Sequence, residues 1–226
     1  MLDRFGLLEQ ILPEVAALKG QEQPPEFHPE GDVFKHTVRM LNLMTPPHAR
    51  LALALLLHDV GKPPTARIGP DRIRFDGHAS AGGEMARVVL ERLRFPADDT
   101  NAITECIRGH MRFMDVRKMK RSTLRRFAGS PDFPLELEVH RLDCQASHGD
   151  LANYRFARRF GREMSQEPIL PEPWITGHDV LELGLTQGPD VGRWLRVAYD
   201  AQLDGRFRTR EELWAWIAGR IASPSP

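Results

Sequence analysis

Residues 51–62 read LALALLLHDVGK, an apolar run that ends in a histidine, an aspartate and a glycine. The run predicts a buried helix, and Gly61 is typical of a helix stop. An unpaired buried carboxylate is costly, so Asp59 needs a cation nearby. Adjacent side chains point roughly 100° apart on a helix, so His58 and Asp59 could hold one metal at the helix end. An ordinary histidine beside a salt-bridged aspartate explains the same stretch, and this segment alone leaves both interpretations open.

The rest of the chain indicates an all-α fold, because apolar residues recur at spacings of three and four and alternating, strand-like runs are absent. Pro13 should kink the first helix. Residues 61–77 are expected to form a long structureless loop, a feature that is often functional. Residues 20–31 and 165–175 are expected to be proline-rich connectors. The expected helices cover residues 3–19, 32–44, 48–60, 78–94, 98–112, 121–129, 134–147, 149–164, 177–184, 190–204 and 208–222.

The composition excludes several classes of protein. The 226 residues carry 31 Lys+Arg and 31 Asp+Glu, which argues against coating nucleic acid or membrane by bulk charge. No apolar run approaches the roughly 20 residues that span a bilayer. The chain begins without the pattern of a secretory signal, and its two cysteines show no CxxC spacing. We therefore expect a cytoplasmic protein with no membrane partner, no disulfide scaffold and no thiolate zinc site.

Further histidines and an aspartate lie on other expected helices. His36 falls within an amphipathic helix, where a lone histidine is usually a hydrogen-bonded core residue. His78 follows the expected loop and begins a helix, where it could equally be an ordinary residue next to the N-cap. His110 lies near the end of a helix, and Asp143 lies inside one, where aspartate has poor propensity and needs compensation.

The order His36, His58–Asp59, His78, His110, Asp143 resembles the HD superfamily of metal-dependent phosphohydrolases, and Lys62 matches that family's HDxGK box. The phrases at 24–33, 74–78, 140–150 and 176–212 resemble one branch, the C-terminal HD body of bacterial tRNA nucleotidyltransferases and poly(A) polymerases. We expect no counterpart of that branch's catalytic head in these residues, since Met1 starts in what resembles its neck helix. Nucleotide addition is therefore not expected from this chain alone.

The resemblance implies a site for divalent metal. One metal would be held by His36, His58, Asp59 and Asp143. A second would be held by Asp59, His78 and His110, although Gly109 replaces a further histidine. Nitrogen and oxygen ligands without thiolate suit Mn, Fe, Co, Ni, Zn or Mg.

The chemistry expected at such a site is phosphoester hydrolysis, in which a metal-bound water attacks phosphorus and Asp59 and Lys62 serve catalysis. Expected substrates are nucleotides or RNA ends with 2′,3′-cyclic or 2′-phosphates. Ordinary exposed arginines in loops or on the surface would show the same sequence pattern as substrate-binding ones. With that alternative open, the candidates for substrate binding are Arg39, Arg74, Arg112 and Arg155.

Basic runs at 112–126 and 155–162 flank Asp143 and raise the hypothesis of an RNA-facing groove, although such runs are usually solvated faces. Two alternatives to a hydrolase stay open: a tRNA-binding body of a split nucleotidyltransferase, and a non-catalytic HD protein. The expected division is a neck-like helix and connector (1–25), an HD core (26–165) and a helical tail packed on the core (166–226).

Overall fold

The apolar residues 51–57 lie in α4 (Ala49–Leu57), which packs against helices from distant parts of the sequence. The structure is a computed structural model and describes residues 2–24, 31–164 and 168–222. Within the described residues, three helices make the main contacts with α4, and Leu55 and Leu57 of α4 are fully buried. These helices are α3 (Val33–Leu43), α7 (Ala97–Gly109) and α9 (Phe133–Ala146).

The all-α prediction is confirmed, and the chain divides into two units. One unit comprises Met1–Asp115 and Pro131–Arg158, and the other comprises Val116–Ser130 and Arg159–Pro226. The three-part division at residues 25 and 165 stays a prediction. Parts of the two expected connectors, residues 25–30 and 165–167, lie outside the described residues.

The first expected helix, residues 3–19, is instead three short pieces. They are η1 (Asp3–Phe5), α1 (Leu8–Ile11) and α2 (Pro13–Ala16). Pro13 starts a new helix, because proline fits the first turn but not a helix interior. Gly6, with φ of 66°, ends η1 in a left-handed conformation.

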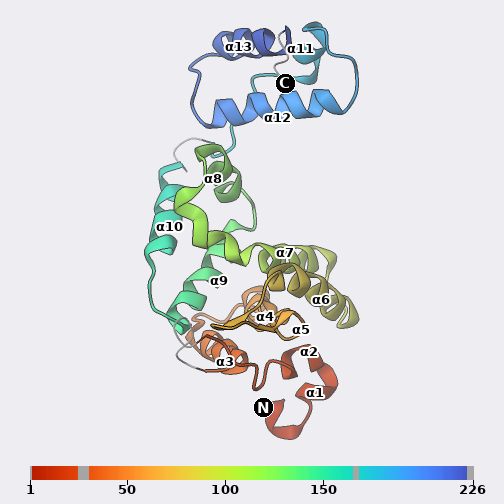
Figure 1. The fold of residues 1–226 in the computed structure, drawn as a ribbon, viewed down its shortest axis with the longest axis vertical. Helices are drawn as coiled ribbons and strands as arrows, with labels where there is room; N and C mark the ends of the chain where they lie inside the picture. The colour runs from red at the N-terminus through yellow and green to blue at the C-terminus, as the bar shows by residue number, and fades with distance from the viewer. Residues whose placement is uncertain (1, 25–30, 165–167, 223–226) are drawn as a thin grey trace. The chain divides into compact units, whose positions relative to one another are not determined.

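The expectation that 61–77 is structureless is wrong. The segment holds α5 (Lys62–Thr65) and an antiparallel hairpin of β1 (Arg67–Ile68) and β2 (Ile73–Arg74), in which Ile68 pairs with Ile73. Strands of two residues are too short to show alternation, which explains why the sequence pattern missed them. The hairpin leads into α6 (His78–Arg92), which packs along α7 (Figure 1).

The end of α7 also differs from expectation. The helix stops at Gly109, and the chain continues as a 3-10 helix, η2 (His110–Lys118), before α8 (Arg121–Ala128). The change from α to 3-10 geometry falls between Gly109 and His110, so His110 is placed by a helix end. Beyond α9 follows α10 (Ala152–Met164).

The second unit has its own core. Val180, Leu213 and Ile217 are fully buried there, and four tryptophans pack around them: Trp174, Trp194, Trp214 and Trp216. Its helices include α11 (Gly177–Glu182), α12 (Pro189–Leu203) and α13 (Arg210–Ala222), close to the expected ranges. Among the described residues, no helix is both long and apolar enough to cross a membrane.

Candidate metal centre

The first group of candidate ligands joins α3, the end of α4 and α9. His36 on α3 is fully buried, and its Nε2 lies 3.1 Å from Oδ1 of Asp143 on α9. The ring centroids of His36 and His58 are 5.7 Å apart. One ligand atom from each of His36, His58 and Asp143 fits within 4.8 Å of the others. Helices far apart in sequence thus bring two nitrogens and a carboxylate together.

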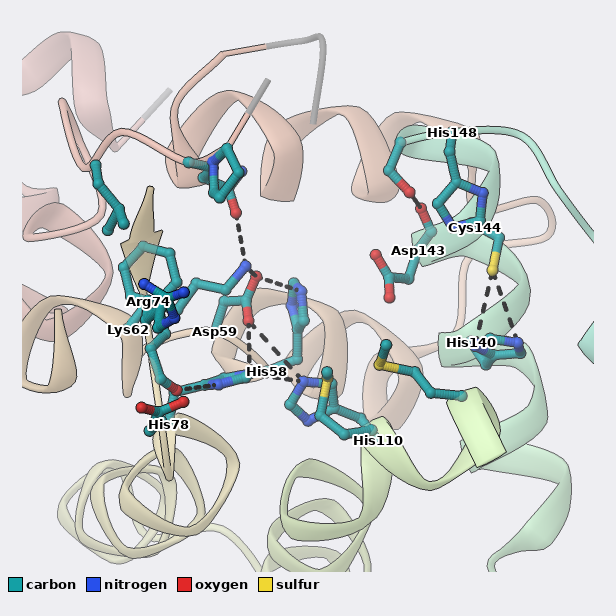
Figure 2. Close-up of a pocket in the computed structure, with 18 of the residues that line it drawn as sticks. His58, Asp59, Lys62, Arg74, His78, His110, His140, Asp143, Cys144 and His148 are labelled. Carbon is teal, nitrogen blue, oxygen red and sulfur yellow. Dashed lines mark hydrogen bonds and ion pairs between the residues drawn. The ribbon is translucent and has the colours of Figure 1, made fainter. Parts of the chain in front are cut away.

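A second group lies on the other side of Asp59. It contains Asp59, His78 and His110, again with ligand atoms within 4.8 Å of one another. His78 is the first residue of α6, after Gly77 turns the chain with φ of 78°, and His110 is the first residue of η2. The two Nε2 atoms are 3.2 Å apart (Figure 2).

The two oxygens of Asp59 face different partners. Oδ2 lies 2.9 Å from Nε2 of His58 and 2.8 Å from Nζ of Lys62. Oδ1 lies 3.7 Å from Nε2 of His78 and 4.0 Å from that of His110, which is too long for hydrogen bonds. Oδ1 is buried without a hydrogen-bond partner among the described residues. Asp59 therefore stands between the two groups with one oxygen directed to each.

Hydrogen bonds to the backbone set the tautomers of three histidines. In His58, His78 and His110, Nδ1 lies 2.6–2.8 Å from the carbonyl oxygen three residues earlier. A carbonyl only accepts, so Nδ1 carries the hydrogen and Nε2 is the ring nitrogen that can bind a metal. In the neutral rings of His78 and His110 the Nε2 lone pairs face each other at 3.2 Å, and they lie 3.7 and 4.0 Å from Oδ1 of Asp59. Such facing acceptors need a cation between them, and imidazoles oriented by backbone carbonyls are typical of metal sites.

The electrostatics keep these groups in the forms that bind a metal. Burial lowers the pKa of His110 to about 4 and also lowers that of His78, so both rings are neutral near pH 7. Burial raises the pKa of Asp59, but His58 and Lys62 outweigh it and hold that pKa well below its ordinary value. For Asp143, His36 outweighs burial in the same way and lowers the pKa. Neutral imidazoles and ionised carboxylates are the ligating forms.

Close contact between Gly61 and Gly82 holds the turn after α4, which carries Asp59, against the start of α6, which carries His78. A Cβ atom on Gly61 would lie 2.1 Å from the backbone oxygen of His78 and 2.5 Å from the backbone nitrogen of Gly82. Only a residue without a side chain lets the turn after α4 touch the first turns of α6. Gly61 is therefore needed for packing, rather than only as the helix stop inferred from sequence.

A cavity of about 420 Å³ opens onto these residues. His58, Asp59, His78, His110 and Asp143 line it, and His36 is buried behind them. The wall also contains residues that the sequence analysis missed: Gln23, Phe75, Met111, Met114, His140 and His148. In Figure 2, His140, Cys144 and His148 lie beyond Asp143, away from Asp59.

His140 shows why such residues escape sequence analysis. Its ring stacks on Phe113 with centroids 4.4 Å apart, and burial lowers its pKa to about 4. Those properties depend on contacts between η2 and α9 that no local pattern encodes.

Of the four arginines predicted to bind substrate, one lines the cavity. Arg74 lines the cavity but is held by two hydrogen bonds to Asp71, at 2.7 and 2.9 Å. Arg39, Arg112 and Arg155 are exposed and do not line the cavity. Their role in substrate binding stays a prediction. Lys62 is buried and donates to Gln23 as well as pairing with Asp59.

Comparison with known proteins agrees with this geometry. The profile of the HD domain matches residues 33–146, which span both groups of candidate ligands from His36 to Asp143. The chain belongs to the HD domain family. HD domains bind divalent metals, and the two His/Asp groups are of the kind that could hold one.

Curated relatives define the branch more closely. The chain is 36% identical to the CC-adding tRNA nucleotidyltransferase of Thermus thermophilus and 34% identical to the A-adding tRNA nucleotidyltransferase of Deinococcus radiodurans. Both alignments cover all of this chain and 54% of the relative. A multifunctional CCA protein of Halorhodospira halophila is 35% identical over 88% of the chain and 48% of its own length. The chain thus spans about half the length of these relatives and is homologous to their HD-containing region.

Proposed function

We propose that this protein is a divalent-metal-dependent phosphohydrolase acting on nucleotides or RNA ends, with 2′,3′-cyclic phosphates and 2′-phosphates as its substrate class. The observation that carries the proposal is that the Nε2 lone pairs of His78 and His110 and the unpartnered Oδ1 of Asp59 face one another in the buried cluster, as far as the structure describes the chain. Groups that only accept hydrogen bonds gain nothing from such proximity unless a cation joins them.

The ligand assignment follows the two groups. His36, His58, Asp59 and Asp143 would hold one cation, and Asp59, His78 and His110 would hold a second, with Asp59 shared. A bound divalent cation supplies Lewis acidity, which polarises a phosphoryl oxygen and makes water a better nucleophile at neutral pH.

Lys62 is paired directly with the carboxylate of Asp59, so its first role is electrostatic. Its ammonium group lies 2.8 Å from Oδ2 of Asp59 and is mostly buried. It therefore holds Asp59 ionised and keeps Oδ1 turned toward His78 and His110. Its charge also lies at the wall of the cavity, where it would attract an anionic phosphoester.

The cavity suits a nucleotide. Its volume of about 420 Å³ falls within the range of small-molecule sites. The candidate ligands form one polar region of its wall, and Phe75, Met111 and Met114 add apolar surface. A phosphate beside the polar region would leave apolar wall for a base or ribose.

Turnover of 2′,3′-cyclic AMP and 2′-AMP with Mn, Ni or Co tests the proposal. We expect hydrolysis by the wild-type protein and its loss in Asp59→Ala. Asp190→Ala is the matched control, because Asp190 is 63% exposed and lies in the other unit. Absence of turnover with every metal, or full turnover by Asp59→Ala, would contradict the proposal.

A second candidate function is the RNA-binding body of a split tRNA nucleotidyltransferase. It is favoured by the relatives, which are named as tRNA nucleotidyltransferases, and by exposed arginines on α10, including Arg155, Arg158 and Arg159. Tight, salt-dependent tRNA binding by metal-free protein that hydrolyses neither substrate would favour this candidate. Protein that binds neither metal nor tRNA would instead indicate a non-catalytic HD protein.

A further inference from the structure

One wall of the cavity comes from the segment that follows α2. Gln23 lies on this segment, lines the cavity and is only 6% exposed. Its side chain reaches Lys62, which is 39 positions later in the chain and is itself paired with Asp59. The segment before α3 therefore places an amide directly beside the candidate metal centre.

The contact with Lys62 fixes the orientation of this amide. Nζ of Lys62 donates to Oε1 of Gln23 at 2.6 Å. An ammonium group has no acceptor, so the amide oxygen must face Lys62 and the NH2 group must be on the other side. Nε2 is buried and has no hydrogen-bond partner among the residues that the structure describes.

A buried amide NH2 group without an acceptor is rare in native proteins and calls for an explanation, of which a bound water, ion or catalytic role is one. Here the unsatisfied donor belongs to a residue of the cavity wall, and the neighbouring side chain is a cation. Two adjacent donors, one neutral and one charged, form a site for an anionic oxygen rather than for a cation or an apolar group.

We propose that Gln23 is a substrate-binding residue whose Nε2 donates a hydrogen bond to a phosphoryl oxygen of the substrate, beside Lys62. This inference rests on the proposed function, because it assigns the phosphoester of that same site to a particular donor. It also gives the segment at 21–24 a role in binding the anion as well as in closing the cavity.

Two substitutions separate this role from a purely structural one. Gln23→Glu keeps an oxygen for Lys62 but replaces the NH2 donor with a second acceptor, which would repel a phosphate. Gln23→Met keeps the length of the side chain and removes both groups. If Gln23 only orders Lys62, the glutamate variant retains phosphate binding and the methionine variant weakens it. If Gln23 binds the anion, both variants weaken it and the glutamate variant does so more.

The experiment is calorimetric titration of inorganic phosphate, which cannot be turned over, into Mn²⁺-loaded protein. We expect the Kd of Gln23→Glu to rise about tenfold or more, as expected for loss of a hydrogen bond to a charged group. Gln21→Glu is the matched control, because Gln21 lies on the same segment and its side-chain amide donates to the neighbouring carbonyl of Glu22. The melting temperature of each variant shows that it is folded, and if the glutamate variant does not fold, an unchanged Kd in Gln23→Met would overturn the inference.

An unchanged Kd in folded Gln23→Glu would overturn the inference, as would the absence of phosphate binding by wild-type protein. Failure of the proposed function would give a different result from failure of this inference. In that case wild-type protein would bind phosphate in a Gln23-dependent manner but hydrolyse neither nucleotide. Conversely, wild-type hydrolysis with an unchanged KM in Gln23→Glu would leave the function intact and reject the role of Gln23.

Discussion

Replacement of Glu136 by glutamine should change how the stability of the protein depends on pH. Glu136 lies on α9, the helix that also presents Asp143, and is only 4% exposed. Burial raises its pKa from the ordinary 4.5 to about 7, against the opposing effect of Arg112. Its Oε2 is buried without a hydrogen-bond partner among the described residues. The native state therefore disfavours the ionised form of this carboxyl.

The sign and size of the effect follow from these values. Below about pH 4.5 the carboxyl is protonated in both native and unfolded chains, so it contributes nothing to the pH dependence. As pH rises toward 7 the unfolded chain releases the proton while the native protein keeps it, so stability falls. A rise in pKa from 4.5 to about 7 corresponds to about 3 kcal/mol, fully lost above pH 7.

Urea denaturation in EDTA at pH 4.5, 6 and 8 measures this, with metal binding removed from the comparison. Relative to wild type, Glu136→Gln should gain about 3 kcal/mol in free energy of unfolding between pH 4.5 and pH 8. Any cost of fitting the amide is independent of pH and cancels in that difference. Glu91→Gln is the control, because Glu91 is 62% exposed. A difference between Glu136→Gln and wild type that stays constant with pH would refute the reasoning.

Two further predictions concern the turn after α4. Gly61→Ala should destabilise the protein by about 3 kcal/mol or prevent folding, because its Cβ would meet backbone atoms at 2.1 and 2.5 Å. Gly219→Ala on α13, where a Cβ meets nothing within 4 Å, should be neutral or stabilising in the same urea series, and equal effects would contradict the packing argument. Asp59→Asn should cost about 3–5 kcal/mol in metal-free protein, because Lys62 stays buried without its carboxylate. Asp59→Asn with Lys62→Met should regain part of that loss in thermal melts, and a purely additive double variant would argue against the pairing.

The sequence predicts the helices because they depend on local apolar periodicity. The apolar run of α4 and the His58–Asp59 pair at its end are adjacent in the chain, so that part of the candidate centre is visible locally. His36, His110 and Asp143 lie on α3, η2 and α9, and it is the resemblance to the HD family, rather than any local pattern, that groups them with this pair.

Other features depend on contacts between distant segments. Gln23 meets Lys62 across 39 positions, and its segment carries no periodic signal. The tautomers of three histidines depend on carbonyls exposed where helices begin or end. Arg39 is three residues from His36, yet it is exposed, because three residues turn a side chain by about 300° rather than by a full turn. Residue spacing alone therefore predicts neither the Gln23–Lys62 contact nor the exposure of Arg39.

Metal binding by the purified protein tests the central claim most directly. Calorimetric titration of Mn²⁺ into EDTA-treated, dialysed wild-type protein should show saturable binding, because the cluster presents at least three nitrogen and oxygen ligands per group. Asp143→Ala should weaken one of the two groups and Asp59→Ala should weaken both, whereas Asp190→Ala should bind as wild type does. No Mn²⁺, Ni²⁺ or Co²⁺ binding by wild-type protein, or wild-type binding by Asp59→Ala, would contradict the account.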